Sequence, residues 1–372
     1  MSTAIDELPQ ELLDAIQDSV SLEPIAPGEA KDKYLQHRRG EIREQTIEEY
    51  DYKLTLFVEY CSQQGIGNLN DLNGRVLDDY KRYRKTETTA TGDPLEVKTL
   101  RDDMFTLRNF ISYLESIEAV PTNLSQKVEI PKLSDDDGVR DIDLAPKRLN
   151  SILNHLNKFE YASDAHVIFA FYSDTGRRPG GLYGLDLKDL HLEVEDPYIE
   201  FSHREGETEL KNGSHGEGQI SITDSVADIF QAYIENHRTD ATDEFGRNPF
   251  LTSQFGRLSK TAMRKRVYAY TRPCVVSGEC PHDRNPDCCD AAQTLNEASK
   301  CPSSKPPYAL RHGYITSKRN EGVPTKVISG RCDVSEDIIE KHYDERDPDE
   351  KRELRREILE QIQAENDQEG YQ

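Results

Sequence analysis

The chain has 372 residues, which is too long for one ordinary domain and long enough for two domains with separate cores. Its formal net charge of −23 argues at first sight against a nucleic-acid partner, because DNA phosphates attract clustered lysine and arginine. The N-terminus lacks a signal-peptide pattern, and no run of about 18 apolar residues occurs. We therefore expect a soluble, cytoplasmic protein with no membrane partner.

Acidic residues are spread along the whole chain, a pattern that resembles halophilic proteins. Positive charge is nevertheless concentrated in two segments. Residues 257–272 hold six basic residues and no acid, and residues 305–331 hold six more against a single glutamate. The first segment favours a helix that contacts DNA phosphates, although a solvated helix face would have the same composition. The candidate DNA-binding residues there are Lys260, Arg264, Lys265 and Arg266.

The N-terminal part predicts a small helical domain. Residues 1–39 include Pro9, Pro24 and Pro27 and lack sustained periodicity, so we expect a poorly packed arm with at most one short helix. Thr46 and Glu49 form a capping box at the start of an amphipathic helix. A second amphipathic helix begins near Thr99, with apolar residues on one face over four turns. With a weaker segment between them, these helices predict a domain over residues 40–125.

Residues 126–144 contain an acidic run and no helical periodicity, which is typical of a linker. A larger domain is expected over residues 145–348. Inside it, residues 197–203 and 219–223 alternate apolar and polar side chains, which predicts a β-hairpin with Lys211 at its bend. The last segment, residues 349–372, is expected to form a polar tail helix.

Five of the seven cysteines lie between residues 274 and 301, in what we interpret as an insertion in the second domain. Thiolate and imidazole ligands at this density are typical of a structural zinc site, although reduced cysteines without a metal remain the alternative. Cys289 could replace Cys288 in the predicted set. The predicted ligands are Cys280, His282, Cys288 and Cys301.

Three further motifs follow one another along the second domain: TGRRPGGL at 175–182, YALRH at 308–312 and SGRCDVSEDIIEKHY at 329–343. In this order they resemble the tyrosine recombinase (phage integrase) family. The resemblance implies a mainly α fold, with a helical core-binding (SAM-like) domain and a mostly helical catalytic domain that contains a small antiparallel sheet. It covers roughly residues 40–345, since the helical N-terminal part resembles the family's core-binding domain.

The resemblance also assigns roles to single residues. Arg178 and Arg311 match the two family arginines, Tyr343 matches the nucleophile, and Lys211 matches the lysine that protonates the leaving 5′ oxygen. His312 fits the usual Arg-His pair, where we expect a DNA contact. Two positions depart from the family. Tyr308 stands where histidine is usual, and Arg331 stands where histidine or tryptophan is usual.

These residue types suit phosphodiester chemistry. Transesterification passes through a pentavalent phosphorane with extra negative charge on its non-bridging oxygens, and planar guanidiniums donate paired hydrogen bonds to such oxygens. Each donor of this kind lowers the barrier by about 3 kcal/mol. A tyrosine nucleophile conserves the bond energy as a 3′-phosphotyrosine, so rejoining requires no cofactor. A phenol with an ordinary pKa of about 10 is a poor general base, which makes the departure at Tyr308 significant.

The expected function is site-specific recombination of double-stranded DNA, of the integration or excision type, by a homotetramer on paired sites. One alternative is a DNA-relaxing enzyme that resembles type IB topoisomerases, which shares the chemistry without synapsis. Another is an inactive, recombinase-derived DNA-binding regulator, which the departures at Tyr308 and Arg331 favour.

Overall fold

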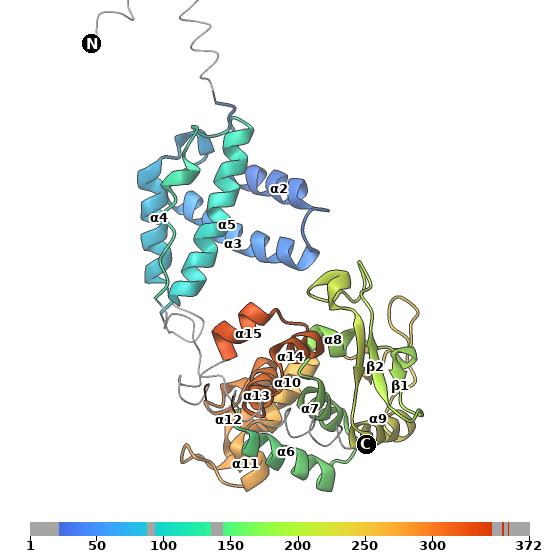
Figure 1. Cartoon of the computed structure of the whole chain (residues 1–372). Coiled ribbons are helices and arrows are strands. Elements are labelled where there is room, and N and C mark those ends of the chain that lie inside the picture. The colour runs from blue at the N-terminus through green and yellow to red at the C-terminus, as the bar shows by residue number, and fades with distance from the viewer. Residues whose placement is uncertain (1–21, 88–93, 135–143, 344–351, 353–355, 357–372) are drawn as a thin grey trace, which may run out of the picture. The chain divides into compact units, whose positions relative to one another are not determined.

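The computed structural model describes residues 22–87, 94–134 and 144–343, together with Arg352 and Arg356 (Figure 1). The chain divides into two compact units, residues 1–140 and 141–372. Helices dominate both units, and the strands form small antiparallel sheets, so the expected mainly α fold class is confirmed. The predicted tail helix lies almost entirely outside the described residues.

The described residues of unit 1 form four α-helices around an aromatic core. Phe57 on α3 packs edge-on against Tyr80 on α4, with ring centroids 5.0 Å apart, and Phe110 on α5 completes the cluster at 6.4 Å from Phe57. Each of these rings is almost fully buried. The helices are α2 (Pro27–Arg38), α3 (Glu44–Gln63), α4 (Gly74–Thr86) and α5 (Val97–Ser116), with short 3-10 turns at Leu69–Asp71 and Ser125–Lys127.

Two features of unit 1 differ from the sequence-based expectation. Helix α3 begins at Glu44 and not at Thr46, and its N-cap is Arg43, which makes no side-chain cap hydrogen bond. The predicted capping box is therefore wrong, because Thr46 already lies inside the first turn. Helix α2 falls in the expected arm, yet Tyr34 from this helix is buried and its ring lies 5.4 Å from that of Phe110. Residues 27–38 thus contribute to the core of unit 1.

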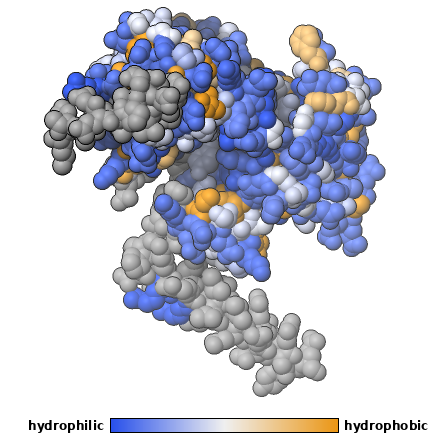
Figure 2. Space-filling model, turned by 90° about the horizontal axis from the view of Figure 1, so that it is seen from above, coloured by the Kyte–Doolittle hydropathy of each residue, from blue (hydrophilic) through white to orange (hydrophobic). Residues whose placement is uncertain are grey.

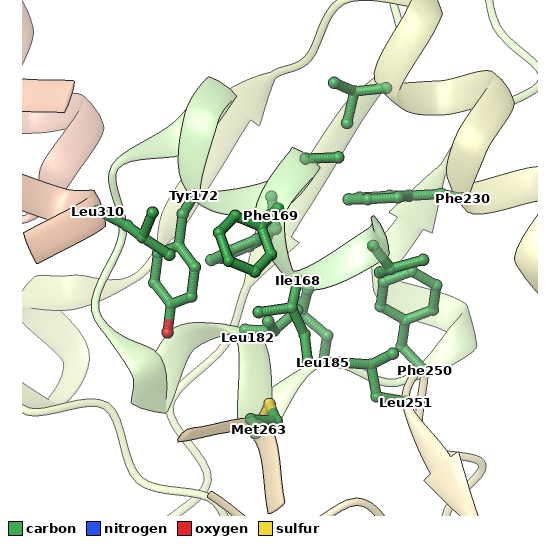
Figure 3. Close-up of a cluster of buried hydrophobic side chains, with 14 of the residues drawn as sticks. Ile168, Phe169, Tyr172, Leu182, Leu185, Phe230, Phe250, Leu251, Met263 and Leu310 are labelled. Atoms are coloured by element: carbon green, nitrogen blue, oxygen red, sulfur yellow. The ribbon is translucent and has the colours of Figure 1, made fainter. Parts of the chain in front are cut away.

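Unit 2 is organised around α7 (Asp164–Thr175), most of whose residues are buried. Ile168, Phe169 and Tyr172 on α7 pack among apolar side chains from the surrounding segments, including Phe230 and Leu310 (Figure 3). This helix is therefore the fixed element on which the others are positioned. The neighbouring helices are α6 (Pro146–Phe159), α8 (Pro179–Gly184), α9 (Asp224–Asn236), α10 (Lys260–Tyr270), α13 (Pro307–Asn320), α14 (Thr325–Cys332) and α15 (Glu336–Tyr343).

The main sheet of unit 2 has the order β1 (Leu190–His191), β2 (Tyr198–Phe201) and β3 (Gly218–Ser221), with antiparallel pairing throughout. β2 lies inside the first predicted segment and β3 overlaps the second, beginning one residue earlier, and their antiparallel pairing confirms the hairpin. Their connection, residues 202–217, carries Lys211 and contains one 3-10 turn at Gly213–Gly216. A second, two-stranded sheet, β4 (Thr252–Ser253) with β5 (Gly256–Arg257), was not predicted.

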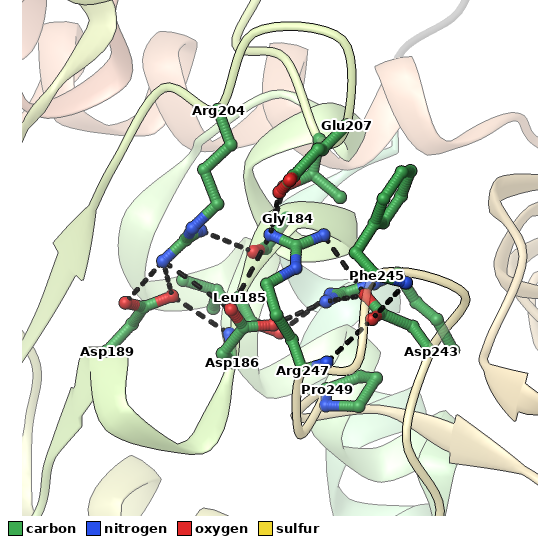
Figure 4. A network of polar contacts seen from close by, with 12 residues as sticks. Gly184, Leu185, Asp186, Asp189, Arg204, Glu207, Asp243, Phe245, Arg247 and Pro249 are labelled. Carbon is green, nitrogen blue, oxygen red and sulfur yellow. Dashed lines mark hydrogen bonds and ion pairs between the residues drawn. The ribbon is translucent and has the colours of Figure 1, made fainter.

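A buried network of charges joins β5 to the segments before β1 and after α9 (Figure 4). Arg257 Nη2 contacts the carboxylates of Asp186 and Asp243, and the two acids are 3% and 4% exposed. Arg204 and Arg247 complete it from two loops. Arg257, which the sequence placed in the basic segment, is therefore a structural ion-pair partner and does not face solvent as a phosphate contact would.

The visible surface in Figure 2 is dominated by hydrophilic residues, with hydrophobic residues in scattered patches. Within the described ranges, no helix is long and apolar enough to cross a membrane.

Candidate active site

The turn between α7 and α8 positions Arg178. Gly176 ends α7 in the left-handed conformation, with φ +59, and a Cβ there would lie 2.2 Å from the Tyr314 ring. Only glycine fits this close approach without displacing its neighbours. Pro179 then begins α8, with Arg178 as its N-cap residue. The guanidinium is thus held at the end of the most buried helix of unit 2.

Helix α13 carries Tyr308, Arg311 and His312 at spacings that place them on one face. Arg311 is 2% exposed, and its Nη1 donates to the backbone oxygens of Gly176 at 2.9 Å and Cys332 at 2.5 Å. Because these acceptors belong to the α7–α8 turn and the end of α14, Arg311 joins three segments that are far apart in the sequence.

Tyr343 is the last residue of α15 and is 3% exposed. The Tyr343 hydroxyl oxygen lies 2.9 Å from that of Tyr308, and the ring centroids of His312 and Tyr343 are 4.7 Å apart. The structure therefore brings together four of the predicted residues: Tyr308, Arg311, His312 and Tyr343. His312, predicted as a DNA contact, packs against the ring of the predicted nucleophile.

Burial raises the pKa of Tyr343 far above its ordinary value, and the hydrogen bond with Tyr308 raises it further. Positive charge and a hydrogen bond from Arg311 oppose that shift. Burial also lowers the pKa of Arg178, and the nearby charge of Arg311 adds to this effect. Two guanidiniums and a phenol thus interact electrostatically in a site from which much of the water is excluded, where fixed charges act strongly on a bound anion.

Asp333 is a member of this site that the sequence analysis missed. Arg178 Nη1 donates to its backbone oxygen at 2.5 Å and to its carboxylate Oδ2 at 2.8 Å. The residue directly follows α14 and adopts a left-handed conformation, with φ 54. The sequence shows that an acid lies between Arg331 and Tyr343 in the third motif. The neighbouring residues do not indicate that this acid binds Arg178.

Arg331 has a different setting from the other arginines. Its Nε donates to the Tyr314 hydroxyl at 2.7 Å, and its Nη2 donates to the backbone oxygens of Asp174 and Ser221, each at 2.8 Å. These bonds join α14 to the end of α7 and to β3. Two of its three guanidinium nitrogens therefore bind the protein itself.

Lys211 is exposed on the loop between β2 and β3. The next residue, Asn212, donates from Nδ2 to Asp333 Oδ1 at 2.7 Å. The structure thus places the loop that carries the predicted general acid in contact with the residue that binds Arg178.

The predicted zinc ligands do not converge. In the described ranges, which include the whole cysteine-rich insertion, no group of three or more metal-ligating side chains is close enough to hold an ion. His282 Nε2 is instead hydrogen-bonded to Ser303 Oγ at 2.9 Å, and the Cys288 thiol donates to the Asn285 backbone oxygen at 3.7 Å. The zinc prediction, with Cys280, His282, Cys288 and Cys301, is therefore not supported, because cysteine density along the chain does not fix where side chains point.

The insertion is packed by other means. Its short helices are α11 (Pro273–Ser277) and α12 (Asp290–Gln293), with 3-10 turns at Pro286–Cys288 and Leu295–Lys300. Ala291 and Ala298 are buried where these elements meet, and Arg272 donates to the Ala291 backbone oxygen. Small apolar contacts and an arginine bond hold the insertion against α10.

Helix α10 contains four of the five predicted DNA-binding residues, in different environments. Arg264 is exposed, and Lys260 lies over the ring of Tyr183 at 4.8 Å from its centroid. Lys265 is half-buried, and Arg266 forms an ion pair with Asp164 at 2.5 Å. The basic segment therefore divides into exposed and internally paired side chains.

The fold of the chain is the tyrosine recombinase fold. No protein-family model and no curated protein matches the chain. Among solved structures, the integrase of the Tn1549 transposon in complex with transposon right-end DNA is 18% identical, matches 89% of this chain and 99% of its own, and has a TM-score of 0.63.

Lambda integrase, solved as a dimer bound to a COC′ core site, is 13% identical, matches 91% of this chain and 82% of its own, and has a TM-score of 0.58. The N-terminal domain of a phage integrase/site-specific recombinase from Haloarcula marismortui is 32% identical over 29% of this chain and 99% of its own, with a TM-score of 0.27.

Proposed function

We propose that this chain is a site-specific DNA recombinase that cleaves and rejoins duplex DNA through a covalent bond to Tyr343. The observation that carries the proposal is the contact set around that residue. The Tyr343 hydroxyl lies beside Tyr308 in a site that also holds Arg311, and the charges of Arg178 and Tyr343 interact. Two structures with the same fold are integrases bound to DNA, which supports the same partner for this chain.

In the proposed reaction, Tyr343 Oη forms a bond to the phosphorus of the scissile phosphate while the bond from phosphorus to the 5′ oxygen breaks. Arg178 and Arg311 donate to the non-bridging oxygens, whose negative charge grows in the transition state. The leaving 5′ oxygen takes its proton from Lys211 Nζ. Rejoining reverses these steps, so the chemistry uses no cofactor.

The phenolic proton of Tyr343 needs an acceptor. Tyr308 is the hydrogen-bond partner, and at 44% exposure it is also in contact with solvent. We infer that the Tyr343 proton moves to the Tyr308 oxygen as the Tyr308 proton moves to water. This route replaces direct transfer to a histidine and suits a site where a phenol occupies the usual histidine position.

Covalent trapping tests the proposal. DNA attached to the protein in cells would be digested, and the fragment left on Tyr343 would be sequenced to define the site. A nicked duplex with that site then traps the adduct in vitro, because the cleaved end diffuses away. We expect a protease-sensitive adduct from the wild type and none from Tyr343→Phe, with site binding equal in both.

Two results would contradict the proposal. An adduct from Tyr343→Phe would assign the nucleophile elsewhere, and binding without any adduct from the wild type would make the chain a DNA-binding regulator. Supercoil relaxation on plasmids that lack the site would favour the topoisomerase-like alternative instead.

Strand exchange between two sites requires an assembly, and we propose a homotetramer on paired sites, with integration or excision as the outcome. Light scattering of the protein on one-site and two-site DNA tests the stoichiometry.

We also propose that the acid excess is a halophilic adaptation. At molar salt the Debye length falls to about 3 Å, which screens long-range repulsion between the protein and DNA. Site binding that persists from 0.1 to 3 M KCl is the expected result, and a steep monotonic loss of affinity contradicts it.

A further inference from the structure

The carboxylate of Asp333 bonds to two parts of the site at the same time. Its Oδ2 accepts from Arg178 Nη1 at 2.8 Å, and its Oδ1 accepts from Asn212 Nδ2 at 2.7 Å. Arg178 is predicted to donate hydrogen bonds to the scissile phosphate, and Asn212 follows the predicted general acid Lys211 in the chain. One side chain, 13% exposed, therefore binds the guanidinium on one side and the lysine loop on the other.

The same loop packs closely on this carboxylate. A Cβ on Gly216 would lie 3.1 Å from Asp333 Oδ2, so the loop backbone lies against the acid. The backbone oxygen of Gly216 accepts from Arg177 Nη1 at 2.8 Å. The tip of the loop is thus bound by Asp333 and its end by Arg177, the residue next to Arg178.

The backbone of Asp333 indicates that this arrangement is maintained at a cost. Its φ of 54 and ψ of 61 lie in the left-handed region, which residues with a Cβ adopt uncommonly, although aspartate and asparagine tolerate it better than most. The conformation turns the chain between α14 and α15 so that both the backbone oxygen and the carboxylate face Arg178. A left-handed aspartate with both carboxylate oxygens bound is a stronger constraint than helix termination requires.

Asp333 also supplies the negative charge in a cluster of arginines. Arg177 and Arg311 are 4% and 2% exposed, and the charges of Arg177, Arg178 and Arg311 repel one another. The charge of Asp333 favours the ionised form of Arg177 and Arg178. The bonds from Arg178 to Asp333 use Nη1 alone, so the acid orients the guanidinium without occupying every donor.

We propose that Asp333 is a positioning residue. Its hydrogen bonds to Asn212 and Arg178, called the tether below, hold the Lys211 loop against Arg178, so that the proton donor and the phosphate-binding arginine keep a fixed relative position. The inference deepens the proposed function and rests on it for the role of Lys211. It predicts that loss of the tether slows cleavage by misplacing the proton donor and leaves the nucleophile unaffected.

The tether itself is testable without DNA. Hydrogen–deuterium exchange of the full chain is compared among the wild type, Asn212→Ala, Asp333→Gly and Asp333→Asn. Glycine accepts the left-handed backbone, so Asp333→Gly removes the carboxylate without adding strain. Because charge-assisted hydrogen bonds are the strong ones, we expect exchange in residues 202–217 to rise about tenfold in Asp333→Gly and Asn212→Ala, and less in Asp333→Asn.

The matched control is Asp337→Asn, which makes the same charge change on the exposed first turn of α15. It should leave exchange in the loop at the wild-type rate. Unchanged exchange in Asp333→Gly and Asn212→Ala overturns the proposal, whether or not the chain cleaves DNA.

The role in catalysis is tested with two versions of the trapped site, one with the ordinary 5′ bridging oxygen and one with sulfur there. When Tyr343 attacks phosphorus, an oxygen leaving group takes the Lys211 proton, whereas a thiolate leaves without one because thiols are far more acidic than alcohols. We expect Asn212→Ala to cleave the oxygen substrate about tenfold or more slowly and the sulfur substrate within about threefold of the wild type.

Asp333→Gly should regain most of its rate with sulfur, whereas Arg178→Ala should stay slow on both substrates. An equal defect of Asn212→Ala on both substrates, or no defect on either, overturns the proposed role of the tether. Failure of the wild type to form any adduct would reject the recombinase function, and the exchange experiment would still decide whether Asp333 holds the loop.

Discussion

The hydroxyl oxygens of Tyr308 and Tyr343 lie 2.9 Å apart, so the predicted nucleophile shares a hydrogen bond with the tyrosine that stands where tyrosine recombinases usually have histidine. Burial raises the pKa of Tyr343, and the bond to Tyr308 raises it further. Since a raised phenol pKa reduces the phenolate fraction at any given pH, Tyr343 is a neutral phenol at neutral pH and must lose its proton during attack.

This relationship predicts a pH dependence. The wild-type cleavage rate should increase steadily from pH 6 to pH 9, because proton removal from Tyr343 limits it. Tyr308→His provides an acceptor with an ordinary pKa of about 6.5, so cleavage at pH 7 should be about tenfold faster and should level off above that pH. Single-turnover adduct formation across this range is the measurement. Tyr308→Phe is the control and should be slower at every pH, while coincident profiles for wild type and Tyr308→His would contradict the proton route.

Arg311 is predicted to act on the transition state more than on DNA binding. Arg311→Ala should reduce cleavage about 100-fold and leave site affinity within a few-fold, as expected of a donor to developing charge. Because Arg311 also binds the Gly176 and Cys332 backbone oxygens, Arg311→Lys is included as a milder change. This variant should likewise lose much more cleavage activity than site affinity. Arg264→Ala, on the exposed face of α10, should show the reverse: weaker binding with a salt slope lower by about one, and normal cleavage at saturating protein. Equal losses of binding and cleavage in Arg311→Ala would make it an ordinary phosphate anchor.

The buried network around Arg257 predicts a large effect on stability. Arg257→Ala removes the nearest ion-pair partner of Asp186 and one of the two arginine partners of Asp243, and should reduce the free energy of unfolding by about 3–5 kcal/mol. Arg264→Ala, a surface change in the same basic segment, should alter it by no more than about 0.5 kcal/mol. Urea unfolding at pH 7 measures both, and similar values for the two variants would show that Arg257 is not structural.

The same network predicts how that difference depends on pH. Burial opposes ionisation of Asp243, but hydrogen bonds from Arg247 and Arg257 outweigh it and lower the carboxyl pKa. A depressed pKa contributes stability above the ordinary value of about 3.9, and this contribution is lost as the pH falls through the folded-state value. The stability difference between wild type and Arg257→Ala should therefore narrow below pH 4. A constant difference down to pH 2 would exclude Asp243 as its source.

The cysteines should divide into two reactivity classes. Burial raises the pKa of Cys61 to about 12 and that of Cys332 to about 11, so both remain protonated thiols at pH 8. The five cysteines of the insertion are partly or fully exposed. Iodoacetamide in native buffer, followed by peptide mass spectrometry, should modify the insertion cysteines and leave Cys61 and Cys332 unmodified until urea is added. Zinc added beforehand should not protect the insertion cysteines from iodoacetamide. Protection by one equivalent of zinc would support the predicted metal site and contradict the geometry.

Local patterns were sufficient for several elements of this fold. The amphipathic helices α3 and α5 and the β2–β3 hairpin follow from side-chain periodicity, and the α7–α8 turn follows from Gly176 and Pro179. Each of these depends on backbone preferences or on one face of an element, which are properties of neighbouring residues in the chain. The packing of helix α2 into the core of unit 1 and the β4–β5 sheet were missed, because their signals are short and depend on what these segments pack against.

The sequence by itself determined the order of the motifs and the residue types available for chemistry, because both are properties of the linear chain. Only the tertiary structure decided their partners. Asp333 lies 155 residues from Arg178 and 121 from Asn212 in the chain, so no local pattern predicts that one carboxylate binds both. In the same way, adjacent basic residues received different partners, and cysteines that are close in sequence did not converge on a metal site. The physical reason is that side-chain direction is set by how helices and loops pack around a core, and this packing depends on the whole chain at once.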